Sequence, residues 1–223
     1  MTPERFNRIK QTLTRRQTDL SVLTDNVHKP HNISAILRTC DAVGIHQIHS
    51  VIPGGIYKLP ARAAMGSTKW VQFVEHESLE GAFKDLKSNG CQIVAAHWSE
   101  RAIDFREVDY TKPTVILMGA EKEGVSDYSA ENADEHITIP MLGMVASFNV
   151  SVAAAIIMAE AQRQRQNKGM YDQRSLEDEQ YYPLLFEWTQ PKVAELCRKK
   201  NIAYPPLTED GDIHPDYWPL KEN

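Results

Sequence analysis

The alternation of strand-like and helix-like segments is the feature of this 223-residue sequence that most constrains its fold. Strands that alternate with helices along a chain pair in parallel, and the helices cover both faces of the sheet. The sequence therefore predicts an α/β fold with a mostly parallel sheet. The expected strands are apolar, β-branched runs at 20–27, 46–52, 91–97, 113–119 and 135–140, and the expected helices lie at 32–43, 78–88, 126–133 and 149–166.

Both ends of the chain carry helical patterns outside this α/β region. Near the N-terminus, Phe6, Ile9 and Leu13 fall on one stripe at helical spacing. In the C-terminal part, charged and proline-punctuated segments such as EWTQPKVAELCRKK replace the strand pattern. We therefore expect an N-terminal basic helix at 1–19, an α/β domain at 20–166 and a C-terminal helical extension at 167–223.

Positive charge is concentrated in the first 40 residues, although the whole chain carries a net charge of −5. Arg8 and Arg15 lie roughly opposite the apolar stripe of the first helix, and Arg5 and Arg16 flank it. Such a row of arginines is either a solvated helix face or a surface that binds phosphates, and the pattern alone leaves both interpretations open.

Composition favours an intracellular protein. No apolar run approaches the roughly 20 residues that span a bilayer, and the polar N-terminus has no signal-peptide pattern. The three cysteines lie far apart and predict neither a disulfide framework nor a zinc site. We expect a cytoplasmic protein with no membrane partner.

Three loop-rich segments follow predicted strands: HKPHNISAILR, LMGAEKEGVS and IPMLGMVASFNVSVAAA. Ligands of parallel sheets bind outside the carboxyl ends of the strands, so these loops are expected to converge on one ligand site. The apolar segment 141–148 is expected to wrap an apolar or aromatic ligand. Taken singly, each polar residue has a structural alternative, as a turn glycine at Gly119 or a helix cap at Asn32, Ser147 or Asn149.

The glycine signatures of dinucleotide and P-loop sites are absent, and no His, Cys and carboxylate cluster has metal-ligand spacing. Instead, NISAILRTCDAVGI, LMGAEKEGVS and IPMLGMVASFNVSVAAAI resemble, in order and spacing, the three motifs of the SpoU/TrmH family of SPOUT RNA methyltransferases. The HKPHN and EAQRQRQNKGMY segments resemble the bacterial members that methylate the ribose 2′-hydroxyl of guanosine 18 in the tRNA D-loop. Methylation of ribosomal RNA or of another tRNA position is the alternative within the family. A catalytically silent RNA-binding module and a small-molecule α/β enzyme are the alternatives outside it.

The resemblance implies a C-terminal trefoil knot that binds S-adenosylmethionine (AdoMet), a homodimer, a tRNA partner and no metal requirement. In the family's mechanism the arginine at Arg38 is the base that deprotonates the ribose. Because an arginine pKa exceeds about 12, positioning a phosphate and stabilising the alkoxide is an easier role, and both stay open. The matching positions are catalytic Asn32, Arg38, Glu121, Ser147 and Asn149 and cofactor-binding Ala96, Gly119, Ile139 and Phe148. Given an RNA substrate, we expect tRNA binding by Arg8, Arg15, Arg16, His31, Arg163 and Arg165.

Overall fold

The structure is a computed structural model of the chain, and it describes residues 1–51, 69–121 and 123–217. The chain divides into two compact units, a sheet unit (Gln17–Met170) and a helical unit (Met1–Arg16 with Tyr171–Asn223). The helices are α1 (Pro3–Thr14), α2 (Pro30–Val43), α3 (Leu79–Ser88), α4 (Asp127–Asn132), α5 (Val150–Asn167), α6 (Asp178–Thr189) and α7 (Pro191–Lys200), with 3₁₀ turns at Phe105–Glu107 and Pro215–Tyr217. The strands are β1 (Leu20–Asp25), β2 (Gln47–Val51), β3 (Gln72–His76), β4 (Gln92–Ala96), β5 (Ile103–Asp104), β6 (Thr114–Gly119) and β7 (Glu135–Thr138).

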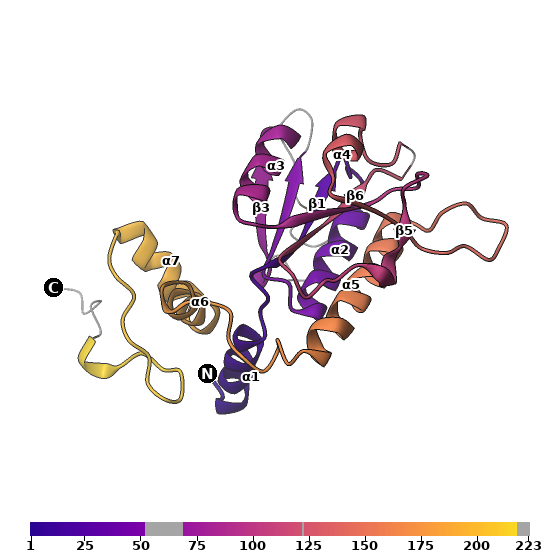
Figure 1. Cartoon of the computed structure of the whole chain (residues 1–223). Helices are drawn as coiled ribbons and strands as arrows, with labels where there is room; N and C mark the ends of the chain where they lie inside the picture. Colours follow the sequence, from indigo (N-terminus) through magenta and orange to yellow (C-terminus); the bar gives the residue numbers. More distant parts are fainter. Residues whose placement is uncertain (52–68, 122, 218–223) are drawn as a thin grey trace. The chain divides into compact units, whose positions relative to one another are not determined.

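The sheet unit is built around a seven-stranded sheet in the order β3-β2-β1-β6-β4-β7-β5 (Figure 1). Every pair of neighbouring strands is parallel, which confirms the predicted α/β class. The central strands β1 and β6 are buried at every position. Strands covered on both faces need apolar side chains on both, and this explains why these segments read as continuous apolar runs.

Helices cover both faces of the sheet, as predicted, and each face has its own core. On one face, Val22 and Ile116 pack among buried side chains of α2 and α5. On the other face, the next residues along each strand, Leu23 and Leu117, pack among buried side chains of α3. This alternation follows from the two-residue side-chain period of a strand. Helix α5 packs directly against α2, and both begin beside the carboxyl edge of the sheet.

Two of the strands were not predicted. β3 is an edge strand whose residues are exposed or half-buried, and β5 has only two residues, so neither forms a buried apolar run. The predicted second strand extends to residue 52, which lies outside the described residues. The trefoil knot implied by the resemblance stays a prediction.

The helical unit combines the N-terminal helix with the C-terminal extension. Helix α1 buries Phe6, Ile9 and Leu13 as its spacing predicts, and it packs against α6, which in turn contacts α7. The tail reaches α1 at Gly211, where a β-carbon would lie 2.6 Å from the Phe6 ring and where φ is +83°. Only glycine adopts this backbone at such close approach without strain. In the described part of the chain, no helix has the length and apolarity to cross a membrane.

Candidate active site

A cavity of about 480 Å³ lies in the sheet unit at the carboxyl ends of β4, β6 and β7. Its volume lies within the range of about 300–1,000 Å³ that is typical of small-molecule sites. The loop after β6 and the segment after β7 form much of its wall, as the convergence of loops predicted. Among its lining residues are all four expected cofactor positions, Ala96, Gly119, Ile139 and Phe148, together with Glu121 and Ser147.

Gly119 is required by the loop that borders this cavity. The loop closes on itself through two backbone hydrogen bonds of 2.9 Å between Ala120 and Gly124. A β-carbon on Gly119 would lie 2.1 Å from the carbonyl carbon of Gly124, a distance that the backbone cannot accommodate. Gly124 itself has a φ of +73°. Gly119 therefore permits a close approach between two parts of the loop, and any effect of its substitution on a cofactor follows from the loop's shape.

A cluster of polar side chains joins three segments that are far apart in sequence. Glu121 Oε1 accepts hydrogen bonds from Asn32 Nδ2 at 2.9 Å and from Asn149 Nδ2 at 2.5 Å. Asn149 Nδ2 also lies 3.2 Å from Asn32 Oδ1. Glu121 Oε2 forms an ion pair with Lys29 Nζ. Hydrogen bonds from Lys29 and Asn32 and the positive charge of Lys29 hold the pKa of Glu121 below its usual range, so it is a carboxylate at neutral pH.

The two asparagines differ in whether they cap a helix. Helix α2 begins at Pro30 and its N-cap is Lys29, so Asn32 lies within the first turn, only 1% exposed, and does not cap the helix. Asn149 does cap α5, because its Oδ1 accepts from Ser151 N at 2.9 Å. Its amide nitrogen remains available to Glu121, so Asn149 has both roles. The buried side chain of Asn32 therefore makes polar contacts with the cluster and none as a helix cap.

A second hollow of about 230 Å³ adjoins the cavity of about 480 Å³ described above. The two share Ala120 and Glu121 in their walls. We call this second space the substrate-side hollow, and its other lining residues are Asn26, Val27, His28, Lys29, Asn32 and Glu123. The two spaces therefore lie next to each other at Ala120 and Glu121.

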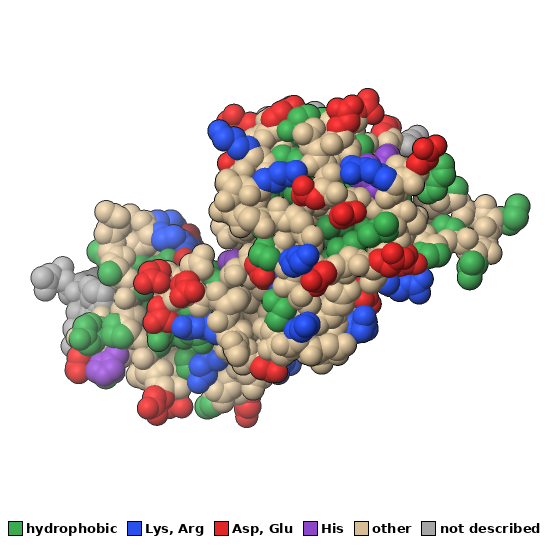
Figure 2. Space-filling view, in the orientation of Figure 1, with side chains coloured by type: hydrophobic (Ala, Val, Ile, Leu, Met, Phe, Trp, Pro, Cys, Tyr) green, Lys and Arg blue, Asp and Glu red, His purple; other side chains and the backbone are tan. Residues whose placement is uncertain are grey.

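The remaining two catalytic candidates differ in their position relative to the two spaces. Ser147 lines the large cavity, and Arg38 is exposed on α2 and lines neither space. The chain after β7 projects from the sheet unit, and hydrophobic side chains gather at its tip (Figures 1 and 2). Leu142 and Met144 are fully exposed there. Only part of this segment, including Met141 and Phe148, lines the cavity.

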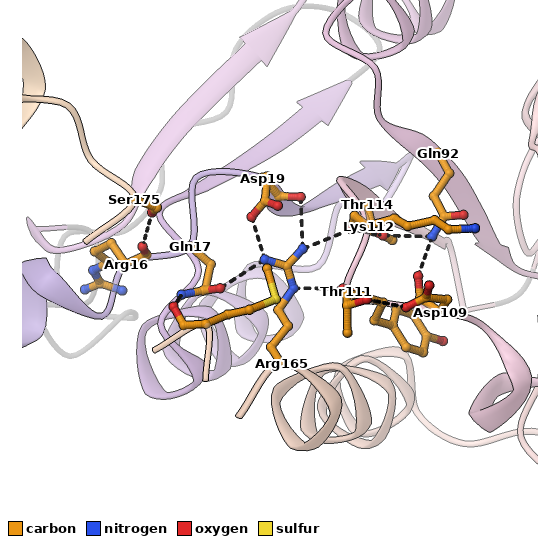
Figure 3. A network of polar contacts seen from close by, with 12 residues as sticks. Arg16, Gln17, Asp19, Gln92, Asp109, Thr111, Lys112, Thr114, Arg165 and Ser175 are labelled. Atoms are coloured by element: carbon orange, nitrogen blue, oxygen red, sulfur yellow. Dashed lines mark hydrogen bonds and ion pairs between the residues drawn. The ribbon is translucent and has the colours of Figure 1, made fainter. Parts of the chain in front are cut away.

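The structure corrects the expected contact of Arg165 with RNA. Its side chain is 0% exposed and lies at the centre of a hydrogen-bond network within the sheet unit (Figure 3). Arg165 donates to the carbonyl oxygens of Tyr110 and Lys112 at 2.8 and 3.0 Å, to Gln17 Oε1 at 3.0 Å and to Asp19 Oδ1 at 2.5 Å. A guanidinium enclosed in this way cannot contact a phosphate.

The expected contact of Arg16 with RNA is also corrected. Its side chain is 0% exposed, and its guanidinium lies 5.4 Å from the ring centre of Trp188 in the helical unit. The other four RNA-binding candidates lie at the surface. Arg163 is exposed and ion-paired with Glu160 at 2.7 Å. Arg8, Arg15 and His31 are also exposed, and RNA binding by these four stays a prediction.

Lys29 and the pair His97 and Trp98 are site residues that the sequence analysis did not identify. Lys29 belongs to the HKPHN segment, so its position beside Asn32 was a usable signal. Trp98 is 81% exposed at the cavity and directly follows His97, just beyond the end of β4. Burial and the neighbouring His136 and Arg101 lower the pKa of His97, which therefore lines the cavity as a neutral side chain.

The cavity suits a cationic, partly apolar ligand. Glu121 is its only described acidic lining residue, and no Lys or Arg is found among the lining residues that the structure describes. AdoMet combines a positively charged sulfonium with an apolar and aromatic body, and it fits this wall. In residues 1–51, 69–121 and 123–217, no group of three or more His, Cys, Asp and Glu side chains could hold a metal ion.

Two adjoining spaces at the carboxyl edge of a parallel sheet are the arrangement expected of an α/β protein that binds ligands at this edge. Residues 19–159 match the model of the SpoU rRNA methylase family, and residues 163–216 match the model of the C-terminal region of SpoU rRNA methylases. The chain belongs to the SpoU rRNA methylase family.

Named relatives are similar over most of the chain. The tRNA (guanosine(18)-2′-O)-methyltransferase of Escherichia coli K12 is 50% identical over 222 residues, which cover 98% of this chain and 97% of the relative. The crystal structure of the Aquifex aeolicus TrmH/SpoU tRNA modifying enzyme has a TM-score of 0.79 and 45% identity, and covers 85% of this chain and 97% of that one. The AviRb methyltransferase of Streptomyces viridochromogenes, solved with AdoMet, has a TM-score of 0.61 and 28% identity. The match covers 69% of this chain and 59% of the AviRb chain.

Proposed function

We propose that this protein transfers a methyl group from AdoMet to the ribose 2′-hydroxyl of guanosine 18 in tRNA. The structural observation that carries the proposal is the pair of adjoining spaces that meet at Ala120 and Glu121. Methyl transfer requires the donor and the acceptor oxygen to be in contact, and these spaces would bring them together. The choice of guanosine 18 is supported by the named activity of the relative that is 50% identical over nearly the whole chain.

The protein's own groups would bind and orient the two substrates. AdoMet would supply the electrophilic methyl group from the cavity lined by Ala96, Gly119, Ile139 and Phe148. On the other side, Asn32 is fixed by Glu121 and would present its amide group to the ribose, and Asn149 would hold Glu121 and Asn32 in place. The developing negative charge on the ribose oxygen is stabilised by donors that are already oriented. Such a reaction does not depend on a metal, because the methyl donor is itself the electrophile.

Arg38 and the apolar segment after β7 lead us to propose a homodimer. Arg38 is exposed and lies outside both spaces, and the fully exposed Leu142 and Met144 belong to the same unit. Large apolar side chains that project into solvent commonly mark an interface between proteins. We propose that dimer formation covers this segment and gives Arg38 a place beside the substrate, and that the enzyme acts on tRNA in the cytoplasm.

The test is to incubate the purified chain with an unmodified tRNA transcript and labelled AdoMet and to map the methylated nucleotide. Label at guanosine 18, lost when that nucleotide carries a 2′-deoxyribose, is the expected result. Label at another tRNA position or only in ribosomal RNA would replace the proposed substrate with the alternative. No transfer to any RNA, together with no binding of AdoMet, would refute the proposal.

A further inference from the structure

Two segments form the described walls of the substrate-side hollow, residues 26–32 and the loop after β6. The first segment follows β1 and the second follows β6, and the last residues of these strands, Asp25 and Gly119, are paired in the sheet. Asn32 of the first segment donates to Glu121 of the second at 2.9 Å. The position of Asn32 relative to Glu121 therefore depends on how the two segments are held to each other.

Asp25 is hydrogen-bonded to both segments. Its Oδ1 accepts from the side-chain amide of Asn26 at 3.2 Å, at the start of the first segment. Its Oδ2 accepts from the backbone nitrogen and the hydroxyl of Ser126 at 2.8 and 2.7 Å, where the loop after β6 ends and α4 begins. Asp25 and Ser126 are 101 residues apart in the chain, so this side chain joins two segments that are distant in sequence.

The burial of Asp25 makes these hydrogen bonds necessary. Its side chain is 1% exposed, and Asp25 is not among the described residues that line either space. A buried carboxyl group is costly unless it is hydrogen-bonded, and all the hydrogen bonds described for this one come from Asn26 and Ser126. Asn26 has a φ of 56°, an uncommon conformation that persists only where its surroundings enforce it. The contacts of Asp25 therefore also hold the turn that leads from β1 into the hollow.

The loop after β6 has an internal restraint that does not depend on Asp25. Two backbone hydrogen bonds between Ala120 and Gly124 close the loop on itself. The bonds from Ser126 to Asp25 lie beyond this closed part and hold the loop against β1. Loss of the Asp25 side chain should therefore shift Glu121 relative to the first segment and leave the shape of the closed loop, and with it the cavity of about 480 Å³, largely intact.

We propose that Asp25 is a positioning residue that sets the distance between Asn32 and Glu121 across the substrate-side hollow, an inference that rests on the proposed function. Asp25 touches neither substrate and acts through the two segments that it joins. Asn32 would present its amide to the ribose only where Glu121 holds it. Methyl transfer requires the ribose oxygen to be aligned with the donated methyl group, and a misplacement of about 1 Å can reduce the rate by about 100-fold.

The test compares Asp25→Ala with Asp25→Asn. Alanine removes every hydrogen bond of this side chain. Asparagine can keep them, because its amide oxygen can accept from Ser126 and its amide nitrogen can donate to Asn26 once the Asn26 amide turns over. We expect the single-turnover rate of tRNA methylation to fall by about 10- to 100-fold in Asp25→Ala and to stay within about threefold of the wild type in Asp25→Asn. The dissociation constant for S-adenosylhomocysteine should stay within about threefold in both.

A carbon-13 NMR titration of the Glu121 carboxyl group gives a readout that needs no RNA. Hydrogen bonds from Lys29 and Asn32 hold the pKa of Glu121 below its usual range. If the two segments separate in Asp25→Ala, this pKa should rise towards its ordinary value, whereas in Asp25→Asn it should match the wild type. A loss of overall stability alone would not change the pKa of Glu121 in the folded protein.

An unchanged Glu121 pKa in folded Asp25→Ala would overturn the inference. A methylation rate of Asp25→Ala within about threefold of the wild type, or equal losses in the two Asp25 variants, would also overturn it. If Asp25→Ala does not fold, Ser126→Ala decides, with Ser78→Ala as its matched control. Each serine caps a helix, α4 or α3, and of the two it is Ser126 that bonds to Asp25. Slower methylation by Ser126→Ala than by Ser78→Ala is expected, and equal rates would overturn the inference.

Failure of the proposed function is distinguishable from failure of this inference. A wild type that methylates no RNA contradicts the proposed function, and the Glu121 titration still tests whether Asp25 holds the two segments together. A wild type that methylates guanosine 18, with Asp25→Ala equally active, contradicts only the role of Asp25.

Discussion

Replacing Arg165 with alanine should destabilise the sheet unit and leave RNA binding to the folded protein nearly unchanged. The substitution removes one partner of a buried ion pair with Asp19 and takes a donor from the carbonyl oxygens of Tyr110 and Lys112, of which Lys112 keeps the Thr114 hydroxyl. Removing one partner of a fully buried pair costs about 3–5 kcal/mol. The Asp19 side chain is 34% exposed, so water can hydrate its carboxylate and the loss falls at the lower end. We expect the free energy of unfolding to fall by about 3 kcal/mol.

The measurement is chemical and thermal denaturation of three variants beside the wild type. A loss of that size corresponds to a decrease in Tm of roughly 6–12 °C for a chain of this length. Arg165→Lys keeps the charge but not the planar fork that reaches several acceptors at once, so it should recover only part of the stability. Arg163→Ala removes an exposed pair with Glu160 and should cost less than about 1 kcal/mol. Wild-type stability of Arg165→Ala combined with weakened tRNA binding would refute this reasoning.

Three further outcomes are expected. Gly119→Ala should abolish binding of S-adenosylhomocysteine in calorimetry, because its β-carbon collides with backbone, whereas Gly81→Ala, whose β-carbon meets only a side-chain oxygen at 3.5 Å, should bind normally. Burial and the nearby His76 lower the pKa of His49 to about 4, so the unfolded state takes up a proton first as the pH falls below its unfolded value of 6.5. Acidification to about pH 5 should therefore cost about 2 kcal/mol in urea denaturation through this group, and His49→Gln should show a flatter dependence. Arg8→Ala should weaken tRNA binding and reduce the salt dependence of binding by about one contact, whereas an unchanged slope would indicate a solvated helix face.

The central strands were predictable because burial on both faces of the sheet requires apolar side chains at consecutive positions. Val22 and Leu23 face opposite sides of the sheet, and each must be apolar. A run of such residues indicates a strand between two layers of helices whatever its partners are. β3 and β5 are absent from the prediction because hydrogen bonding to a neighbouring strand, β2 or β7, defines them. Backbone pairing at a sheet edge does not require a side-chain pattern, so the sequence carries little record of it.

The helical spacing of Arg165 indicated that it is buried, but the prediction gave more weight to its charge. Arg165 continues the buried stripe of α5 formed by Ala154, Met158 and Ala161. Helical spacing therefore indicated burial, but the positive charge favoured a surface position. The structure makes burial possible because acceptors from the segments just before β1 and β6 surround the guanidinium.

The sequence by itself determined the layers of the sheet unit and the loops that line the cavity, and its resemblance to a family pointed to Asn32, Glu121 and Asn149 as site residues. The layers and loops follow from local rules, since side-chain period acts over a few residues. Only the tertiary structure decided what these side chains contact. Lys29 and Glu121 are 92 residues apart in the chain, and Asn32 and Asn149 are 117 apart. They meet because parallel pairing brings the carboxyl ends of β1 and β6 to one edge and α5 begins beside them, an arrangement set by the packing of the whole sheet.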